Sequence, residues 1–487
     1  MQRIRTLRHR TSTALLALAF AAAACSTNPA TGKKQLAMMG QGQEIEMGRQ
    51  ADQEISATMG LYPDEKAQAY VDRVGKALAA KSERPDLPWT FRILDDPIVN
   101  AFALPGGYVY VTRGLMTHLT SEAELASVLG HEIGHITGRH TVERLSKAQL
   151  ASIGLAVGMI LQPELRNYGD LAQAGLGLLF LKYSRDDERE ADSLGLRYLS
   201  GGNYDPQEMV EVFDVLRRVS EQQKQGRVPG WMATHPTPED RIQRISAEVA
   251  KVPAPGGDQI VARERYLQAI DGVVFGDNPR EGYFRGNTFV HPELGFQLTF
   301  PQGWKPSNQK QAVGAISPRE DAVVVLTLSG RSSPEQAARE FFSQQGVQQG
   351  PALRASLGGL PAVANVFGVA RQQQPSLQGI AAFVELGGKV YQLLGYTTQN
   401  RWNGYDDLLS GAIGSFERVT DRRLLDVQPK RVDVVTLPSA MTLEEFARRY
   451  PSTVDLKTLA IINHVEGNER IPAGTEVKRV VGGELPA

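Results

Sequence analysis

Apolar residues recur at the spacing of an α-helix in the stretch that follows residue 121. They stand three or four positions apart, so they would line one buried face. Ser121, just before them, is a favourable N-cap, and Glu124 three residues later completes the signature of a capping box. The pattern therefore predicts a helix that begins near Ser121. Its apolar face would consist of Leu125, Val128, Leu129, Ile133 and Ile136.

In the second half of the chain, apolar and polar residues alternate as in antiparallel strands. The change follows a Pro- and Gly-rich linker at 252–257 and a short helical stretch at 260–271. Two helices interrupt the strands, one from Pro334 to about Phe342 and one near Tyr405–Phe416. This order predicts an α+β domain over 285–420. Its strands are expected at Phe296–Phe300, Ala322–Leu328, Ala362–Val369, Ala381–Leu386 and Lys389–Tyr396.

A last small unit is expected over residues 430–483. A strand at Val432–Leu437, helices at Thr442–Tyr450 and Leu456–Asn463, and a strand at Glu476–Val481 give a β-α-α-β order. With 487 residues, the chain is too long for one core, so the fold class we expect is an α+β multidomain protein. The net charge of −1, with no long basic run after the first ten residues, argues against nucleic-acid binding.

Residues 1–24 have the composition of a secretory signal peptide, with four arginines before a short apolar stretch. Cys25 is the only cysteine, so no disulfide framework is possible. A lone cysteine after three alanines resembles a bacterial lipoprotein signal. This resemblance implies a lipidated Cys25 and, with Ser26 next to it, an anchor in the outer membrane facing the periplasm. A plain secretory signal is the alternative.

Two further apolar stretches, 151–162 and 171–181, lie between charged residues. Each is shorter than the roughly 20 residues that a membrane-spanning helix needs. They predict buried or interfacial helices, or a flap beside a cleft.

The predicted helix after Ser121 carries the motif His131-Glu132-Ile-Gly-His135. Residues four apart share one helix face, so two neutral imidazoles there can bind one Zn²⁺. Glu132, beside the first histidine, can act as a general base on a water molecule. The pattern is that of a zinc peptidase, and two ordinary histidines on a helix are the alternative.

A catalytic zinc site needs a third protein ligand. His140 would point away from the shared face of a continuous helix, so we expect it to be a surface or packing histidine. Ser184 predicts the start of a second helix, on which Glu188 and Asp192 share a face and Glu190 points to the far side. The spacing leaves Glu188 and Asp192 both open as ligands, and a solvated acidic face is the alternative.

Four motifs in the same order resemble the HtpX/BepA-type zinc metallopeptidases, which are gluzincins related to the CAAX prenyl proteases. They lie at Asn100–Leu115, His131–Arg144, Tyr183–Asp192 and Thr234–Arg241. The resemblance covers about residues 30–250 and implies a mainly helical metallopeptidase domain with a small sheet, for which we expect the bounds 25–255. A linker with a short helix would follow at 256–284.

The same resemblance implies roles for individual residues. Glu188 would be the third metal ligand beside His131 and His135, and Asp192 would accept a hydrogen bond from a ligating imidazole. His235 could approach the metal and take the position of water, or be an ordinary turn histidine before a proline. His235 and Arg241 are also our candidates for donors to the developing oxyanion.

The segment from Asn100 to Thr112 is the expected platform for a polypeptide substrate. A Pro-Gly-Gly turn precedes an alternating run that reads as a strand. An exposed edge strand can bind an extended peptide through its backbone, whereas an ordinary strand in a small sheet could not. The candidate substrate residues are Asn100, Tyr108, Val109, Tyr110 and Val111.

Two weaker resemblances concern the remaining units. The run Gly295–Trp304 is similar to PsbP-like domains, where we see no catalytic residues and expect a binding or spacer domain. The β-α-α-β unit with Ile471-Pro-Ala-Gly474 resembles a LysM domain. That implies binding of peptidoglycan glycans, although a structural module is the alternative because the family's opening Gly-Asp-Thr signature is replaced by Ser439–Thr442.

The first functional hypothesis is therefore a zinc endopeptidase of the bacterial envelope. It would cleave misfolded or misassembled proteins, with outer-membrane assembly components as further partners. An envelope binding or chaperone lipoprotein, whose zinc site is silent or capped by His235, is the second. A cell-wall-binding lipoprotein with incidental peptidase activity is the third.

Overall fold

The computed structural model describes residues 25–149, 182–223, 231, 235, 238–252, 258–371 and 374–486. The expected signal peptide, the flap at 151–181 and most of the linker at 252–257 lie outside the described residues. The described chain is a mixture of helices and sheets, and none of its helices is both long and apolar enough to cross a membrane.

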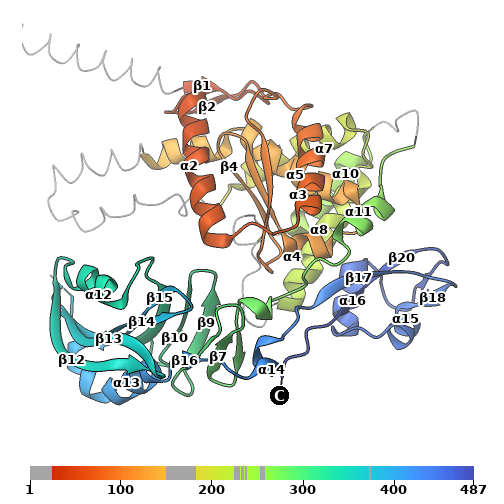
Figure 1. The fold of residues 1–487 in the computed structure, drawn as a ribbon. Coiled ribbons are helices and arrows are strands. Elements are labelled where there is room, and N and C mark those ends of the chain that lie inside the picture. The colour runs from red at the N-terminus through yellow and green to blue at the C-terminus, as the bar shows by residue number, and fades with distance from the viewer. Residues whose placement is uncertain are drawn as a thin grey trace, which may run out of the picture. The chain divides into compact units, whose positions relative to one another are not determined.

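Two compact units make up the structure (Figure 1). The first combines the chain up to Gly276 with Arg431–Val481, and the second is built from Asp277–Lys430 with the last residues, Gly482–Ala487. The first unit is therefore discontinuous, because the second is inserted into it along the sequence.

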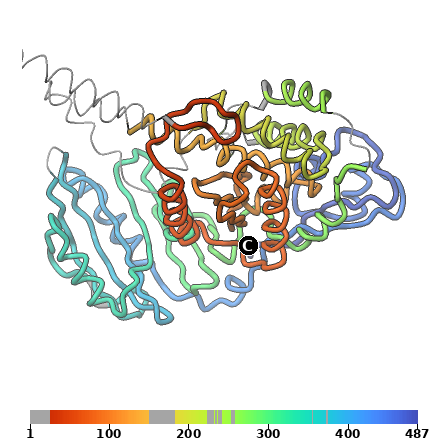
Figure 2. Tube along the Cα trace, turned by 90° about the horizontal axis from the view of Figure 1, so that it is seen from above, coloured from red at the N-terminus to blue at the C-terminus, as the bar shows by residue number. Residues whose placement is uncertain are grey.

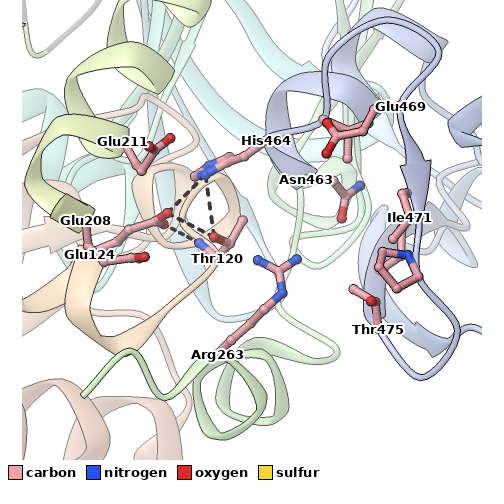
Figure 3. A pocket seen from close by; sticks show the side chains of 13 residues that line it. Thr120, Glu124, Glu208, Glu211, Arg263, Asn463, His464, Glu469, Ile471 and Thr475 are labelled. Atoms are coloured by element: carbon pink, nitrogen blue, oxygen red, sulfur yellow. Dashed lines mark hydrogen bonds and ion pairs between the residues drawn. The ribbon is translucent and has the colours of Figure 1, made fainter. Parts of the chain in front are cut away.

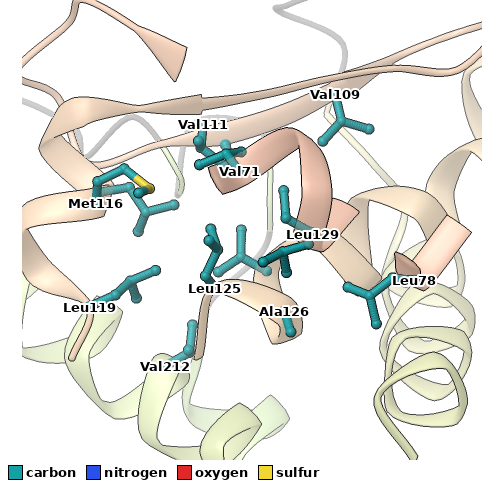
Figure 4. Close-up of a cluster of buried hydrophobic side chains, with 14 of the residues drawn as sticks. Val71, Leu78, Val109, Val111, Met116, Leu119, Leu125, Ala126, Leu129 and Val212 are labelled. Atoms are coloured by element: carbon teal, nitrogen blue, oxygen red, sulfur yellow. The ribbon is translucent and has the colours of Figure 1, made fainter. Parts of the chain in front are cut away.

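Helix α5 (Glu122–Thr137) lies at the centre of the first unit, and all of its residues are buried. Its apolar face packs against α3 (Glu65–Ala79) and α8 (Gln207–Gln223), as Figure 4 shows. This confirms the buried face predicted from the sequence. The other helices of the unit are α2 (Gln41–Met59), α4 (Arg113–His118), α7 (Arg185–Gly201), α10 (Pro238–Val249) and α11 (Arg263–Ile270).

Ser121 caps α5 as predicted, since its side-chain oxygen accepts a hydrogen bond from the N–H of Glu124 at 3.0 Å. The second bond of the capping box is displaced by one residue. The Glu124 carboxylate accepts from the N–H of Thr120 at 2.5 Å and from its hydroxyl at 2.9 Å. The cap prediction was correct, and the expected reciprocal bond to Ser121 was wrong.

Helices α5 and α7 approach each other closely because small residues face across the contact. A Cβ atom added to Gly134 would lie 2.9 Å from the carbonyl oxygen of Ala191, and one added to Gly195 would lie 3.0 Å from the backbone nitrogen of His131. Neither position tolerates a side chain without movement of a backbone. The small residues Ala191 and Gly195 thus let the second helix come close to the motif helix.

A three-stranded sheet covers the other side of α5. It consists of β3 (Thr90–Leu94), β5 (Tyr108–Thr112) and β4 (Ala101–Leu104) in the order β3-β5-β4. Strand β5 pairs in parallel with β3 and antiparallel with β4. The expectation of an exposed edge at Tyr108, Val109, Tyr110 and Val111 is therefore wrong, because β5 is the middle strand. The edge next to α5 is β4.

Residues 431–481 form a C-terminal module within the first unit. Its antiparallel strands β17 (Arg431–Thr436) and β20 (Glu476–Val481) enclose α15 (Leu443–Arg449) and α16 (Leu456–Asn463). The β-α-α-β order predicted from the sequence is observed. Two short strands, β18 (Met441–Thr442) and β19 (Arg470–Ile471), pair with each other.

The C-terminal module contacts the chain just before α5. Nδ1 of His464 lies close to the Glu124 carboxylate beside Thr120, as Figure 3 shows. The fully buried Lys478 donates from Nζ to the carbonyl oxygens of Thr117 at 3.0 Å and Leu119 at 2.5 Å. Burial lowers the pKa of Lys478 well below its ordinary value. A cavity of about 280 Å³ lies beside this contact.

The second unit consists of two antiparallel sheets and short helices. A seven-stranded sheet has the order β12-β13-β14-β15-β11-β10-β9, and a four-stranded sheet has the order β16-β8-β7-β6. Figure 2 shows the long strands β12 to β15 side by side. The strands are β6 (Tyr283–Arg285), β7 (Thr288–His291), β8 (Phe296–Thr299), β9 (Lys305–Gln309), β10 (Ala312–Ile316), β11 (Ala322–Leu328), β12 (Val347–Leu357), β13 (Leu360–Val369), β14 (Leu377–Leu386), β15 (Lys389–Thr398) and β16 (Glu417–Arg418).

All the strands predicted in this half coincide with observed ones. The two predicted helices correspond to α12 (Pro334–Phe342) and α13 (Asp406–Gly414). A further short helix, α14 (Arg422–Leu425), was not predicted. The core of the larger sheet is apolar and contains no group that takes part in the site described below.

Candidate metal centre

Four side chains that could hold a metal ion converge in the first unit. His131 and His135 come from α5, Glu188 comes from the first turn of α7, and His235 lies shortly before α10. One potential ligand atom from each lies within 4.8 Å of every other, and all four residues are buried. Helical geometry explains the first pair, because residues four apart on α5 point to the same side.

The distances between these atoms fit a small tetrahedral ion. Nε2 of His131 lies 3.0 Å from Nε2 of His135, 3.4 Å from Nδ1 of His235 and 3.6 Å from Oε2 of Glu188. Nε2 of His135 lies 3.6 Å from Oε1 of Glu188. With zinc–nitrogen bonds of about 2.0–2.1 Å, neighbouring ligands of a tetrahedral ion lie about 3.3 Å apart.

The protonation states also suit metal binding. Burial lowers the pKa of His131 and lowers that of His135 well below its ordinary value, so both imidazoles are neutral. Burial alone would raise the pKa of Glu188, but His235 and Arg241 lower it overall, so the carboxylate is ionised. Neutral imidazoles and an ionised carboxylate are the forms that bind a metal ion.

Glu132 places a second carboxylate beside the cluster. Its side chain is fully buried, and neither of its oxygens accepts a hydrogen bond from any described residue. Nε2 of His235 lies 3.7 Å from Oε1 of Glu132. Burial raises the pKa of Glu132 to about 7. A buried carboxylate without a partner is costly, so its position fits a polar species held at the metal position.

Asp192 supports the first histidine from behind. Its Oδ1 lies 2.9 Å from Nδ1 of His131, which leaves Nε2 of that ring directed to the cluster. Asp192 is itself fully buried, and Arg241 and Arg244 both bond to it. Burial would raise the pKa of Asp192, but Arg241 and His131 hold it far below its ordinary value.

Arg241 binds the two carboxylates of α7 together. It donates from Nε and Nη2 to Asp192 at 3.0 and 2.5 Å, and its Nη1 lies 2.9 Å from Oε2 of Glu188. Its guanidinium also lies over the ring of Phe213, 4.4 Å from the centroid. Nε and Nη2 of Arg241 are thus bound to Asp192, whereas Nη1 faces Glu188 without a hydrogen bond to any described residue.

Two aromatic rings lie against the cluster. The sequence had not predicted them as part of the site. Trp231 stacks on His235 with ring centroids 4.1 Å apart, and Tyr183 stacks on His135 with centroids 3.7 Å apart. Trp231 stands four residues before His235, and its carbonyl oxygen accepts a bond from the His235 N–H at 2.9 Å. The spacing of four residues, which places two side chains on one helix face, was a signal in the sequence that could have placed Trp231 beside His235.

His140 lies next to the cluster, contrary to expectation. It is 2% exposed, and its Nδ1 lies 2.9 Å from Nδ1 of His135. The prediction assumed one continuous helix, but α5 ends at Thr137 and Arg139 adopts the left-handed region with φ 57°. The chain therefore turns back and brings His140 under His135. It is a packing histidine, as proposed, but not a surface one.

The remaining candidate substrate residue, Asn100, precedes the edge strand β4. Its N–H donates to the hydroxyl of Thr112 at 3.1 Å, and its buried Oδ1 accepts no hydrogen bond from the described residues. The neighbouring Val99 carbonyl accepts a bond from the N–H of Trp231 at 3.3 Å. The start of β4 thus lies beside a residue that packs against the cluster.

Comparison with known proteins identifies this region. Residues 65–249 match the model of peptidase family M48. This segment is a peptidase family M48 domain. It contains His131, Glu132, His135, Glu188 and His235, so the site described above belongs to a metallopeptidase domain.

Relatives of the M48 domain come from bacteria and mitochondria. The beta-barrel assembly-enhancing protease of Escherichia coli (strain K12) is 29% identical over 237 residues, which are 47% of this chain and 48% of that protein. The mitochondrial metalloendopeptidase OMA1 of Arabidopsis thaliana is 32% identical over 219 residues, which are 44% of this chain and 42% of that protein. The chain thus spans less than half the length of these curated relatives.

Among solved structures, the solution structure of cyanobacterial PsbP from Synechocystis sp. PCC 6803 is similar at 16% identity with a TM-score of 0.23. The match covers 27% of this chain and 91% of that one.

Proposed function

We propose that this chain is a zinc-dependent endopeptidase that hydrolyses peptide bonds in polypeptides. The observation that carries the proposal is the buried group of His131, His135 and Glu188 beside the Glu132 carboxylate. Two imidazoles and one carboxylate are a ligand set of catalytic zinc sites in peptidases. We expect one Zn²⁺ per chain.

The residues around the site have distinct roles in this proposal. A bound Zn²⁺ would polarise the scissile carbonyl and make water acidic enough to attack it near neutral pH. Glu132 takes the proton of the attacking water and passes it to the leaving amine, for which a pKa of about 7 is well suited. Asp192 holds the ring of His131, and Arg241 holds the carboxylates of Asp192 and Glu188 in place.

His235 provides a fourth potential ligand, and we propose that it occupies the position of water in the resting enzyme. Its Nδ1 lies 2.7 Å from Oε1 of Glu188 and faces Nε2 of His131. An arriving substrate would displace it, and the freed ring could then donate to the oxyanion. If this arrangement is permanent, the second candidate function applies, a binding or chaperone protein with a capped metal site.

The substrate strand belongs at β4 in this proposal. Strand β4 forms the edge of the described sheet, and its contacts with α5 place it along the helix that carries the motif. An extended peptide that pairs with β4 would bind through its backbone, largely independently of its sequence. Misfolded or misassembled polypeptides, which expose such segments, are therefore the expected substrates.

We place the protein in the periplasm of a bacterium, anchored to the outer membrane through a lipidated Cys25. The signal-like composition of residues 1–24 and the relative named as a beta-barrel assembly-enhancing protease support this placement. Outer-membrane assembly components are the corresponding partners. In this scheme the metallopeptidase domain spans 25–255, and a linker with the short helix α11 follows at 256–284.

The order of strands and helices also suggests roles for the two remaining modules. We assign residues 285–420 to a PsbP-like α+β domain that acts as a spacer or binding module, and residues 430–483 to a LysM-like module with peptidoglycan as its candidate ligand. The strand and helix order of each module supports the assignment. A pull-down of the full chain with peptidoglycan, with and without residues 431–481, would test the ligand.

The decisive experiment compares the purified chain with its Glu132→Gln variant. Both should carry one zinc ion per chain by elemental analysis, because Glu132 is not a ligand. Only the wild type should digest casein, and a chelator should abolish that digestion. A wild-type chain that carries zinc but digests nothing would favour the capped binding protein, and a chain without metal would contradict both.

A further inference from the structure

The two histidines of α5 are supported by different partners. His131 is backed by the carboxylate of Asp192, whereas His135 is backed by a second imidazole, that of His140. We propose that His140, Glu190 and Asn28 form a hydrogen-bonded chain that holds the His135 ring with Nε2 facing the metal position. The inference concerns positioning residues and rests on the metal site of the proposed function.

The Glu190 carboxylate accepts from both of its neighbours and so sets the direction of the hydrogen bonds in this chain. Oε1 of Glu190 lies 3.3 Å from Nε2 of His140 and 2.5 Å from Nδ2 of Asn28. An ionised carboxylate only accepts, so Nε2 of His140 must carry a proton. The other ring nitrogen of His140, Nδ1, lies 2.9 Å from Nδ1 of His135 and is the atom placed to accept the Nδ1–H of that ring. This leaves Nε2 of His135 without a proton and free to bind a metal.

The chain is built into the interior of the domain. His140 is 2% exposed and Asn28 is 5% exposed, so water competes little for these bonds. Tyr183 covers the face of the His135 ring, and its hydroxyl lies 3.0 Å from that of Thr141. The ring is thereby fixed by stacking on its face and by a hydrogen bond at its outer edge.

The backbone before His140 is shaped to allow this contact. A Cβ atom on Gly138 would lie 2.5 Å from Nε2 of His140, so only glycine leaves room for the ring. Arg139 adopts a φ of 57°, which is unfavourable for a residue with a side chain. Arg139 donates to Met39 O at 2.8 Å and to Glu44 at 3.2 Å, and these bonds hold the strained turn.

Through Asn28, the N-terminal hairpin also contributes to the hydrogen-bonded chain behind His135. Asn28 stands in the turn between β1 (Cys25–Thr27) and β2 (Lys34–Leu36). Its Oδ1 accepts from the N–H groups of Ala30 and Thr31, which orients Nδ2 toward Glu190. The hairpin that directly follows the expected lipid anchor therefore supports His135.

The first test reads the tautomer of His135 in the metal-free full chain by ¹⁵N NMR. The expected signal is that of a proton on Nδ1 in the wild type. The signal should shift toward a mixture of tautomers in His140→Leu, and it should be retained in His140→Asn. Asparagine keeps an acceptor near the position of Nδ1, and leucine has a similar size without one. A proton on Nε2 in the wild type, or the same spectrum in both variants, would overturn the proposal.

The second test measures the zinc dissociation constant by competition with a chromophoric chelator. His140→Leu should weaken binding about 10- to 100-fold, and Glu190→Gln and Asn28→Ala about tenfold. His140→Asn should recover most of the loss. Asp186→Asn is the matched control, because Asp186 is 90% exposed on the same helix and should leave the constant unchanged. Unchanged affinity in His140→Leu would overturn the proposal.

These two readouts separate the inference from the proposed function. If the wild type binds no zinc, the proposed function fails, while the tautomer in the metal-free chain still decides the inference. If zinc binds tightly but the tautomer is the opposite one, the inference fails and the proposed function stands.

Discussion

Nδ1 of His464 lies 3.0 Å from Oε1 of Glu124, and this pair joins the C-terminal module to the first turn of α5. Nε2 of the same ring lies 2.9 Å from the carbonyl oxygen of His118. Burial would raise the pKa of Glu124, but His464 and the bonds from Thr120 lower it. The start of the motif helix is thus fixed by residues from the other end of the chain.

Replacing His464 should loosen that end of α5. His464→Asn removes the ring, while asparagine tolerates the φ of 56° at this position. We expect the free energy of local opening at the start of α5 to fall by about 1–3 kcal/mol, because the buried Glu124 carboxylate loses its contact with the His464 ring. Hydrogen exchange of a peptide over residues 118–130 measures this change.

The matched control for that experiment is Glu466→Gln, which changes an exposed charge two residues away. It should leave the exchange of the same peptide unaltered. Equal protection in His464→Asn and the wild type would show that the module does not stabilise α5.

The close contact of α5 and α7 leads to a second prediction. Gly195→Ala would place a Cβ atom 3.0 Å from the backbone nitrogen of His131, so the helices must separate. We expect a loss of about 1–3 kcal/mol in the free energy of unfolding and weaker zinc binding, since Glu188 moves away from the histidines. Urea unfolding and chelator competition measure the two effects.

Gly201→Ala on the same helix is the control, since its Cβ atom would meet nothing closer than 3.8 Å. That variant should bind zinc like the wild type. If Gly195→Ala also kept full affinity, the contact would be less constrained than the distances indicate.

Removal of the fourth potential ligand, His235, should activate the enzyme. If the capped arrangement is favoured by about 1.4 kcal/mol, His235→Ala should raise the rate of peptide hydrolysis about tenfold. A fluorogenic peptide assay at saturating zinc measures the rate, and the zinc content of both proteins serves as the control. A rate equal to or below that of the wild type would refute the resting role of His235.

Stability should fall as pH rises because of Glu208. Burial, together with the nearby charge of Glu124, raises the pKa of Glu208 from 4.5 to about 7 in the folded chain. Between these values the folded chain holds a proton that the unfolded chain has lost, so raising the pH favours unfolding. The shift corresponds to about 3 kcal/mol at most.

Glu208→Gln tests this directly, because glutamine can still accept the bond from Ser121 without titrating. The variant should be more stable than the wild type at pH 8, and the difference should shrink toward pH 5. Thermal unfolding at the two pH values measures it. A difference that is independent of pH would assign the effect to something other than this carboxyl group.

The sequence predicted elements whose hydrophobic pattern is local. The bounds of α12, α16, β11 and β20 agree with those expected from periodicity and turn residues. These features depend only on neighbours along the chain.

The failures concern contacts that depend on residues distant in sequence or on unusual backbone. The alternation in β5 is the same for a middle strand and an edge strand, and only pairing with β3 decides between them. The left-handed conformation of Arg139 is not encoded by a residue type that favours it, so the turn that buries His140 was missed. The bonds from Arg241 to Asp192 likewise join two helices, α10 and α7, whose packing no local pattern predicts.

The discontinuity of the first unit has a consequence for biosynthesis. Chains are made from the N-terminus, and domains tend to fold as soon as their residues are available. Here the carbonyl oxygens of Thr117 and Leu119 accept from the side chain of Lys478, which lies beyond the inserted second unit in the sequence. The first unit, which holds the candidate metal centre, can therefore be completed only after the inserted second unit has been synthesised.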